Sequence, residues 1–270
     1  VMNSGGITAR LLDLCMFFVG RLKGGLGLVN VVASMIFGGI SGSSASDTAS
    51  IGSVLIPEME KRGYTKSFAA GITVASSTMG MIIPPSVPMI LYAIVAQESV
   101  GQLFLGGIIP GVMVGAFQLF LVYWVAKRKD FPTEDISFTV QEGVRQIKRS
   151  AVVLIMPVLI VGSVVFGIAS PTETAGLAVA YGLLIGLMIT GTSVLKEMPT
   201  LMRSAIITSA KIMVIIAFSQ LYIWVLALER VPDQLADFVI SFGLGPIGLM
   251  LVIALLVLIV GTFIDVSPAI

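Results

Sequence analysis

The chain has 270 residues, of which 56% are hydrophobic and 11% charged, and its formal net charge is +1. Soluble domains carry about 25% charged residues, so this composition excludes a soluble globular domain, and the near-zero net charge argues against nucleic acid as a partner. Histidine is absent and Cys15 is the single cysteine, which excludes a disulfide framework, a cysteine-based metal site and a histidine-dependent catalytic triad. We therefore expect an all-α polytopic membrane protein.

Both ends of the sequence indicate a fragment of a longer chain. The first residues, VMNSGGITAR, lack the basic region and apolar core of a signal peptide. The last residues, VGTFIDVSPAI, stop within an apolar stretch. We expect residues 1–24 to form an interfacial arm helix that follows spans absent from this chain.

The first apolar runs are too short to cross a bilayer, which takes about 20 residues in a helix. Residues 26–37 and 51–59 flank the serine-rich segment GGISGSSASDTASIG at 38–52, and charged residues lie beyond both outer ends. This pattern predicts a re-entrant hairpin that enters and leaves the membrane on the same side. Its non-helical tip would have to be buried in protein or line a water-filled cavity.

The next stretch, FAAGITVASSTMGMIIPPSVPMILYAIVA at 68–96, is long enough to cross but is interrupted. Prolines remove backbone donors and glycine adds conformational freedom. The interruption contains four such residues: Gly80, Pro84, Pro85 and Pro88. We expect a broken helix whose free carbonyl groups lie at 77–85. With the hairpin it would make up residues 25–97.

Four longer apolar stretches follow, each of about the length that a hydrocarbon core demands: 107–126, 150–169, 172–190 and 205–228. We expect cytoplasmic helices that lie on the membrane surface at 135–148 and 192–203, within the stretch 98–228. Residues 229–270 are predicted to hold another arm helix and the truncated first half of a second re-entrant hairpin.

The basic residues support this topology. If the N-terminal segment and both ends of the hairpin are cytoplasmic, all of the 16 Lys and Arg residues except Arg230 lie on the cytoplasmic side, as the positive-inside rule requires. A hairpin that crossed the membrane completely would place these basic residues on both sides of the membrane.

A weak internal repeat relates residues 10–43 to residues 234–267. Each copy has an Asp-containing amphipathic start, a Gly-x-x-Gly, an apolar run and a polar tip with glycine. The predicted topology gives the two copies opposite orientations. Inverted repeats with interrupted segments are typical of secondary transporters whose site lies near the bilayer midplane.

The hairpin tip and the broken helix both supply oxygen ligands. They are the side chains of Ser41, Ser43, Ser44, Ser46, Asp47, Thr48, Ser50, Ser76, Ser77 and Thr78, and the carbonyl groups near Gly80, Ile83 and Pro85. Oxygen-only sites suit hard cations. A buried carboxylate without a basic neighbour must be protonated or paired with something outside the sequence. We infer a sodium ion, with a proton as the alternative. Half-helix N-termini at the tip favour an anionic substrate group.

Simpler interpretations exist for each motif. The serine-rich segment is typical of a plain loop, the proline cluster of a structural kink, and Asp47 of a helix N-cap. Glu173 is predicted to be an acid in the first turn of a helix. Two rival functions are an intramembrane aspartyl protease that uses Asp47 and Asp265, and a passive channel.

Several segments closely resemble the large membrane subunit of TRAP (tripartite ATP-independent periplasmic) transporters. They are GGISGSSASDTASIGSVLIPEMEKRGY, FAAGITVASSTMGMIIPPSVPMILY, MNSGGITARLLDL, ASPTETAGLAVAY and FIDVSPAI. The resemblance implies an inverted-repeat, elevator-type secondary transporter of the bacterial inner membrane, and not an enzyme. Residues 25–97 would be its transport domain, and residues 98–228 its scaffold, with 135–148 and 192–203 as arm helices. It would take up a small carboxylate with sodium and without an organic cofactor. Its partners would be a small membrane subunit, a periplasmic binding protein and membrane lipid. A sodium/dicarboxylate carrier that works without a binding protein is the alternative.

The resemblance also implies site residues. The first sodium site would use Ser43, Ser46, Asp47, Thr78, Gly80, Ile83 and Pro85. The second would begin with Gly261, Thr262 and Asp265. The substrate is expected to contact Ser44, Ser46, Thr48 and Ser86.

Overall fold

The computed structural model describes residues 7–129, 131, 140–191, 193–241, 243 and 245–263. These residues form helices and connecting turns, without a β-strand among them, which confirms the all-α class. Four helices are long and apolar enough to cross a membrane: Val100–Lys129, Pro171–Met188, Ser193–Leu228 and Pro246–Phe263. A bent pair, Arg145–Val152 with Leu154–Val165, raises the number to as many as five. These segments confirm the predicted polytopic class and cover the four long spans expected from the sequence.

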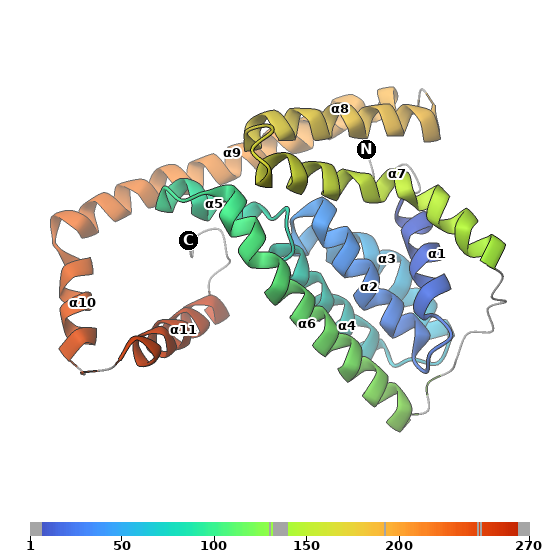
Figure 1. Cartoon of the computed structure of the whole chain (residues 1–270), viewed down its shortest axis with the longest axis horizontal. Coiled ribbons are helices and arrows are strands. Elements are labelled where there is room, and N and C mark those ends of the chain that lie inside the picture. Colours follow the sequence, from blue (N-terminus) through green and yellow to red (C-terminus); the bar gives the residue numbers. More distant parts are fainter. Residues whose placement is uncertain are drawn as a thin grey trace. The chain divides into compact units, whose positions relative to one another are not determined.

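The chain divides into two compact units, Val1–Met198 and Pro199–Ile270. The first unit holds α1 (Ile7–Val19), α2 (Gly25–Ser41), α3 (Ser44–Lys61), α4 (Lys66–Ser77), the 3-10 helix η1 (Thr78–Met81), α5 (Val87–Ala96), α6 (Val100–Lys129), α7 (Val140–Val165) and α8 (Pro171–Thr190). α9 (Ser193–Leu228) continues into the second unit, which also holds α10 (Val231–Ser241) and α11 (Pro246–Phe263). In the first unit, α2 contacts α1, α3, α4 and α6 (Figure 1).

The predicted hairpin consists of α2 and α3, which are separated only by Gly42 and Ser43. Gly42 has a φ of 62°, which glycine adopts without the strain of a side chain. Ser43 is the N-cap of α3, and its hydroxyl accepts the N–H of Ser46 at 3.5 Å. The expectation of a long non-helical tip is therefore wrong, because the serine cap allows α3 to begin at Ser44. The interpretation of Asp47 as the N-cap is also wrong.

The predicted broken helix is confirmed. α4 ends at Ser77, η1 follows, and α5 begins at Val87 after a non-helical segment that contains the cis Pro84–Pro85 bond. Ser86 is the N-cap of α5, and its hydroxyl accepts the N–H of Met89 at 3.5 Å. This cap satisfies a donor that hydrocarbon cannot satisfy.

Glycines on one face of α6 allow it to approach the hairpin and the broken helix closely. A Cβ at Gly107 would lie 2.6 Å from the Ile82 carbonyl oxygen, and one at Gly111 would lie 2.5 Å from Ile83. A Cβ at Gly115 would lie 2.5 Å from the sulfur of Met35 in α2. α6 therefore packs directly on both elements, although the sequence predicted it as part of the scaffold.

Two expected arm helices are continuous with the spans that follow them. α7 runs through to Val165 and α9 from Ser193 to Leu228, so that neither arm is a separate helix. α7 bends by 49° between Arg145–Val152 and Leu154–Val165, but the helix does not end where its polar first half meets the apolar second half at 148–150, and no glycine or proline lies there. The part of the first arm at 135–139 lies outside the described residues.

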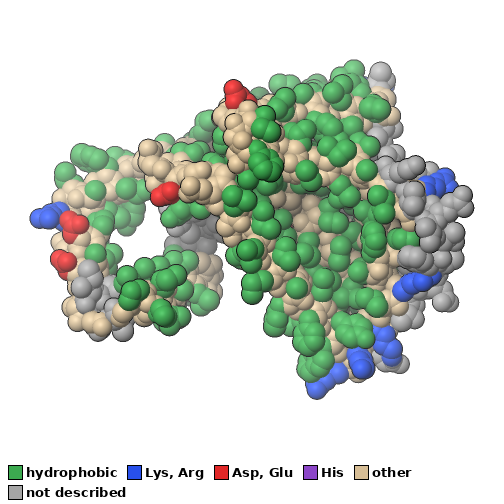
Figure 2. Space-filling model, viewed as in Figure 1, with side chains coloured by type: hydrophobic (Ala, Val, Ile, Leu, Met, Phe, Trp, Pro, Cys, Tyr) green, Lys and Arg blue, Asp and Glu red, His purple; other side chains and the backbone are tan. Residues whose placement is uncertain are grey.

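Basic side chains gather at one end of α6, and the local capping of α8 agrees with the sequence prediction. In Figure 2 the basic side chains of the first unit lie at its lower and right-hand edges, where α6 ends with Lys127, Arg128 and Lys129. Glu173 forms a capping box with Ser170, in which its carboxylate accepts the Ser170 N–H at 2.8 Å. The predicted place of Glu173 in the first turn of a helix is confirmed.

Replacing Gly107 with Ala should destabilise the protein, because the Ile82 backbone oxygen in its way cannot rotate aside. Overpacking of this kind costs about 1–3 kcal/mol. Gly106→Ala is the matched control, because a Cβ there meets nothing within 4 Å and alanine is favoured over glycine in helices by about 1 kcal/mol. Thermal unfolding of the two full-length variants in detergent should show a lower midpoint for Gly107→Ala only. Equal midpoints would contradict the α6 contact.

Candidate functional site

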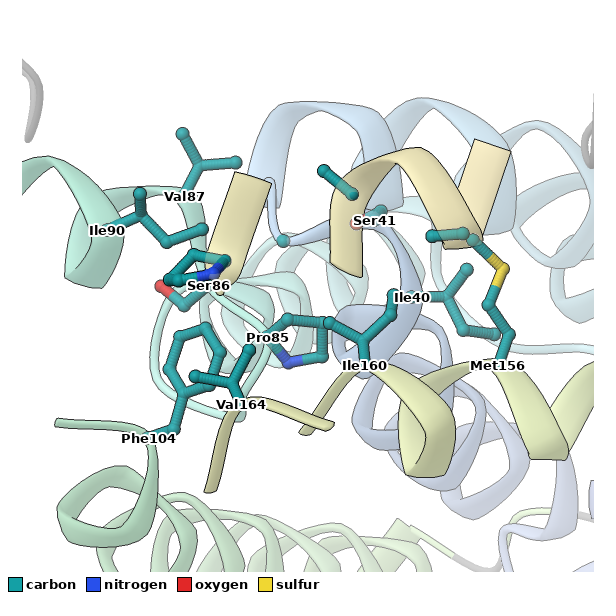
Figure 3. Close-up of a pocket in the computed structure, with 14 residues that line it drawn as sticks. Ile40, Ser41, Pro85, Ser86, Val87, Ile90, Phe104, Met156, Ile160 and Val164 are labelled. Atoms are coloured by element: carbon teal, nitrogen blue, oxygen red, sulfur yellow. The ribbon is translucent and has the colours of Figure 1, made fainter. Parts of the chain in front are cut away.

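The tip of the hairpin touches the non-helical segment of the broken helix. The N–H of Val87 donates to the carbonyl of Gly42 at 3.3 Å. A Cβ at Gly42 would lie 3.0 Å from the carbonyl oxygen of Pro85, so this oxygen lies against the tip. Ser41, Pro85 and Ser86 line the same cavity in Figure 3. The two interrupted elements of the sequence thus meet in one place.

Asp47, in the first turn of α3, is fully buried at this meeting point. The hydroxyl of Ser41 donates to its Oδ1. Its Oδ2 is also buried and has no hydrogen-bond partner in the described part of the chain. Buried polar atoms are normally paired, and a buried carboxylate without a partner is costly. An unpaired carboxylate oxygen of this kind can act as a ligand for a cation.

Two glycines enclose this unpaired oxygen. A Cβ at Gly80 would lie 2.5 Å from Oδ2 of Asp47, and one at Gly38 would lie 2.6 Å from the Cα of Gly80 and 3.4 Å from the same Oδ2. Any side chain at Gly80 would occupy the space beside the carboxylate. The backbones of α2 and η1 approach each other here because both positions lack side chains.

Helix ends of opposite polarity surround the tip. α3 and α5 begin beside Gly42, with Ser43 and Ser86 as their N-caps. α2 ends at Ser41, and η1 continues the C-terminal end of α4. Helix N-termini attract anions and helix C-termini attract cations. The same small region can therefore hold an anion and a cation side by side.

The residues predicted for the first sodium site differ in their positions relative to Asp47 and the hairpin tip. Gly80 contacts Asp47, and Pro85 presents its carbonyl oxygen to the tip. Ser43 caps α3, whereas Ser46 is exposed on the first turn of that helix.

Two further members of the predicted set have other local contacts. The exposed Thr78 donates its hydroxyl to the carbonyl of Ala75 at 2.7 Å. Ile83 packs against Gly111 of α6. Of the predicted set, Asp47, Gly80 and Pro85 are therefore the residues that lie where the hairpin meets the broken helix.

The predicted second sodium site lies in the other unit. Gly261 and Thr262 belong to α11, and the Thr262 hydroxyl donates to the Leu258 carbonyl at 2.8 Å. The sequence predicted these two residues in a non-helical tip, but α11 extends to Phe263. Asp265 lies outside the described residues.

A cavity of about 240 Å³ lies beside the hairpin tip (Figure 3). Residues of the tip, the broken helix, α6, α7 and α8 line it, among them Ser41, Ser86 and Phe104. Most of its lining is apolar.

The residues predicted to contact substrate differ in their relation to this cavity. Ser86 is fully buried, donates its hydroxyl to the Met81 carbonyl at 2.6 Å and accepts the Met89 N–H as a helix cap, so its hydroxyl already has two backbone partners. Ser44, Ser46 and Thr48 lie on the first turns of α3 and are not among the lining residues.

The sequence did not indicate several residues of this region. The sequence pattern indicates Ser41 as an oxygen donor without placing it in the sodium site, and it does not indicate Gly38. Asn30 and Ser34 of α2 are also fully buried. Asn30, Ser34 and Gly38 recur every four residues within an apolar helix, and this helical spacing of small and polar residues was the available signal.

Comparisons with known proteins agree on one family. The model of the tripartite ATP-independent periplasmic transporter DctM component matches residues 1–270. The sialic acid TRAP transporter large permease protein SiaM of Vibrio cholerae is 34% identical over 98% of the chain and 62% of its own length. The C4-dicarboxylate TRAP transporter large permease protein DctM of Pseudomonas aeruginosa is 34% identical over 100% of the chain and 63% of its own length.

A third relative is longer. The isethionate TRAP transporter permease protein DctMQ of Oleidesulfovibrio alaskensis is 35% identical over 100% of the chain, which covers 42% of that relative. The chain thus spans less than two thirds of the length of each of these relatives.

Gly80→Ala should destabilise the protein by about 1–3 kcal/mol, because the added methyl group would push Oδ2 of Asp47 out of its position. Gly71→Ala, in α4, is the control, since a Cβ there meets nothing within 4 Å. The cost of Gly80→Ala should fall in an Asp47→Ala background, where the clashing oxygen is gone. Thermal unfolding of the full-length wild type, Gly80→Ala, Asp47→Ala and the double variant forms a double-mutant cycle, and strictly additive effects would show that Gly80 and Asp47 are not in contact.

Proposed function

We propose that this chain, which belongs to the DctM component family of tripartite ATP-independent periplasmic transporters, carries the first cation-binding and anion-binding elements of a sodium-coupled carrier. Membership of a transporter family confirms that the chain is not an enzyme and rules out the aspartyl protease alternative. The chain is a helical protein of the bacterial inner membrane.

The proposed cation is sodium, and its central ligand is Oδ2 of Asp47. The observation that supports it most is that this buried carboxylate oxygen has no partner among the described residues. Ser41 already donates a hydrogen bond to Oδ1, so Oδ2 is the carboxylate oxygen that remains to bind an ion. The backbone of Gly80 lies beside Oδ2 of Asp47, and the Pro85 carbonyl oxygen lies against Gly42, so we propose these two carbonyl groups as the neutral ligands. Hard oxygen donors with a single carboxylate suit a monovalent cation.

The ion would supply the positive charge that this site lacks. None of the ion pairs found among the described residues involves Asp47. Without a cation, the carboxylate would have to take up a proton to remain buried. Sodium binding would thus stabilise the contact between the hairpin tip and the broken helix.

The proposed substrate is a small organic anion, and its anionic group would lie at the N-termini of α3 and α5. These termini converge at Gly42 beside the cavity. The relatives are named for sialic acid, C4-dicarboxylate and isethionate. The first two are carboxylates and the third is a sulfonate, so their shared chemistry is an oxyanion. Fixed backbone N–H groups can bind either class, and we propose a carboxylate for this chain.

The proposed transport step is an elevator motion of the hairpin and the broken helix. The glycine contacts of α6 with both elements favour its movement with them, rather than with a scaffold formed by later spans. A small membrane subunit and a periplasmic binding protein would complete the transporter. The alternative, a carrier that needs no binding protein, predicts uptake that does not change when the binding protein is omitted.

Asp47→Asn should reduce sodium-driven uptake by about 10- to 100-fold, because removal of a charged ligand costs about 1.5–3 kcal/mol. The measurement is uptake by proteoliposomes that contain the full-length transporter and its binding protein, in sodium and in choline. Asp13→Asn, on the exposed side of α1, is the matched control and should transport normally. Unchanged uptake and sodium dependence in Asp47→Asn would refute the cation site.

The same vesicles distinguish a carrier from a channel and sodium from a proton. A carrier concentrates labelled substrate against its gradient when sodium flows inward, whereas a channel only equilibrates it. Accumulation in choline driven by an imposed pH gradient would favour the proton instead.

A further inference from the structure

A second group of buried polar side chains lies between α2 and α4. Asn30 and Ser34 of α2 face Thr73 and Ser76 of α4, and all four are fully buried. The Asn30 amide donates to the Thr73 hydroxyl at 2.7 Å, and the Ser76 hydroxyl donates to the Asn30 amide oxygen at 3.1 Å. The hydroxyl groups of Ser34 and Ser76 lie 2.8 Å apart. We call these four side chains the polar ladder.

The polar ladder satisfies its own hydrogen bonds. The Thr73 hydroxyl also donates to the Ala69 carbonyl at 2.8 Å, and the Asn30 amide lies 3.9 Å from the sulfur of Met59. None of the ladder atoms is among the buried polar atoms without a partner in the described residues. The ladder therefore offers no vacant ligand position for an ion, and its effect must be on the placement of the two helices.

The hydrogen bonds of Asn30 define the register of α2 against α4. One amide group binds Thr73 and Ser76, which lie three residues apart on one face of α4. A slip of one residue shifts a helix by about 1.5 Å along its axis. Such a slip would break both hydrogen bonds and leave buried polar atoms unpaired, which costs free energy. A purely apolar contact between the two helices would not carry this cost.

The same face of α2 leads directly to Asp47. Asn30, Ser34 and Gly38 recur at intervals of four residues, and Gly38 contacts Gly80 and the space around Oδ2. Ser41, three residues after Gly38, donates to Oδ1 of Asp47. The axial position of α2 therefore decides how closely Gly38 approaches Gly80 and whether the carboxylate stays enclosed.

We propose that Asn30 is a positioning residue of the transporter: through its bonds to Thr73 and Ser76 it sets the register of α2 against α4, and through Gly38 and Gly80 it keeps Asp47 enclosed for cation binding. The cation-binding part of this statement rests on the proposed function. The register and the enclosure of Asp47 rest only on the contacts described above.

Labelling of Asp47 by dicyclohexylcarbodiimide, an apolar carboxyl reagent that enters membranes, tests this role in the full-length transporter. The labelling rate is followed by peptide mass spectrometry in choline and in sodium. Asn30→Ala should accelerate labelling in choline by about tenfold or more, because local opening of the site becomes more frequent. Thr73→Val removes one hydroxyl at constant shape and should act in the same direction.

Ser53→Ala is the matched control, because this exposed serine on α3 donates only to the Ser50 carbonyl, at 2.9 Å. Its labelling rate should equal that of the wild-type protein. The thiol of Cys15, which is 1% exposed in α1, reports general loosening through its reaction with a maleimide. This reaction should remain as slow in Asn30→Ala as in the wild type.

The outcomes separate the two proposals. An unchanged labelling rate of Asp47 in Asn30→Ala, or a parallel rise in Cys15 reactivity, would overturn the positioning role. Protection of wild-type Asp47 by sodium tests the cation site, and its absence would count against the proposed function alone. If both proposals hold, Asn30→Ala should also raise the sodium concentration needed for half-maximal protection, while Ser53→Ala should not.

Discussion

The contact between the hairpin tip and the broken helix depends on two positions without side chains. Gly38 and Gly80 allow the backbones of α2 and η1 to meet beside the carboxylate of Asp47. This carboxylate is fully buried and keeps one oxygen unpaired in the described part of the chain, so it must either bind a cation or take up a proton. The packing of the surrounding helices either keeps Gly38 and Gly80 in contact or depends on that contact.

The serine hydroxyl groups of this region form hydrogen bonds with backbone groups, and not only with a proposed ligand. Ser43 caps α3 and Ser86 caps α5, so two helices can begin next to each other at the tip. In a hydrocarbon environment, N–H groups at such helix starts have no water to bind and must find partners in the protein. A serine-rich segment therefore arises from the need to end and restart helices at depth. The carboxylate of Asp47 is the feature that capping does not explain.

The packing of α6 extends the unit that surrounds the tip. Its small residues face the broken helix at Gly107 and Gly111 and the hairpin at Gly115. Such close helix contacts are typical of membrane proteins, where lipid is as apolar as the side chains and association depends on close packing. α6 therefore packs with the hairpin and the broken helix as one group of helices.

The sequence by itself determined the elements and their interruptions. Apolar length predicted the long spans, two short apolar runs around a serine-rich segment predicted the hairpin, and the proline cluster predicted the break before α5. These features follow from local backbone chemistry and from the length of the hydrocarbon core. The predictions for the start of α3 and for separate arm helices were wrong. Helix caps and helix continuity depend on which partners the backbone groups at each helix end find. Only the tertiary structure decided which polar groups meet, such as Asn30 with Thr73 or Ser41 with Asp47 beside Gly80. Contacts between helices distant in sequence depend on register and side-chain shape, which no local pattern encodes.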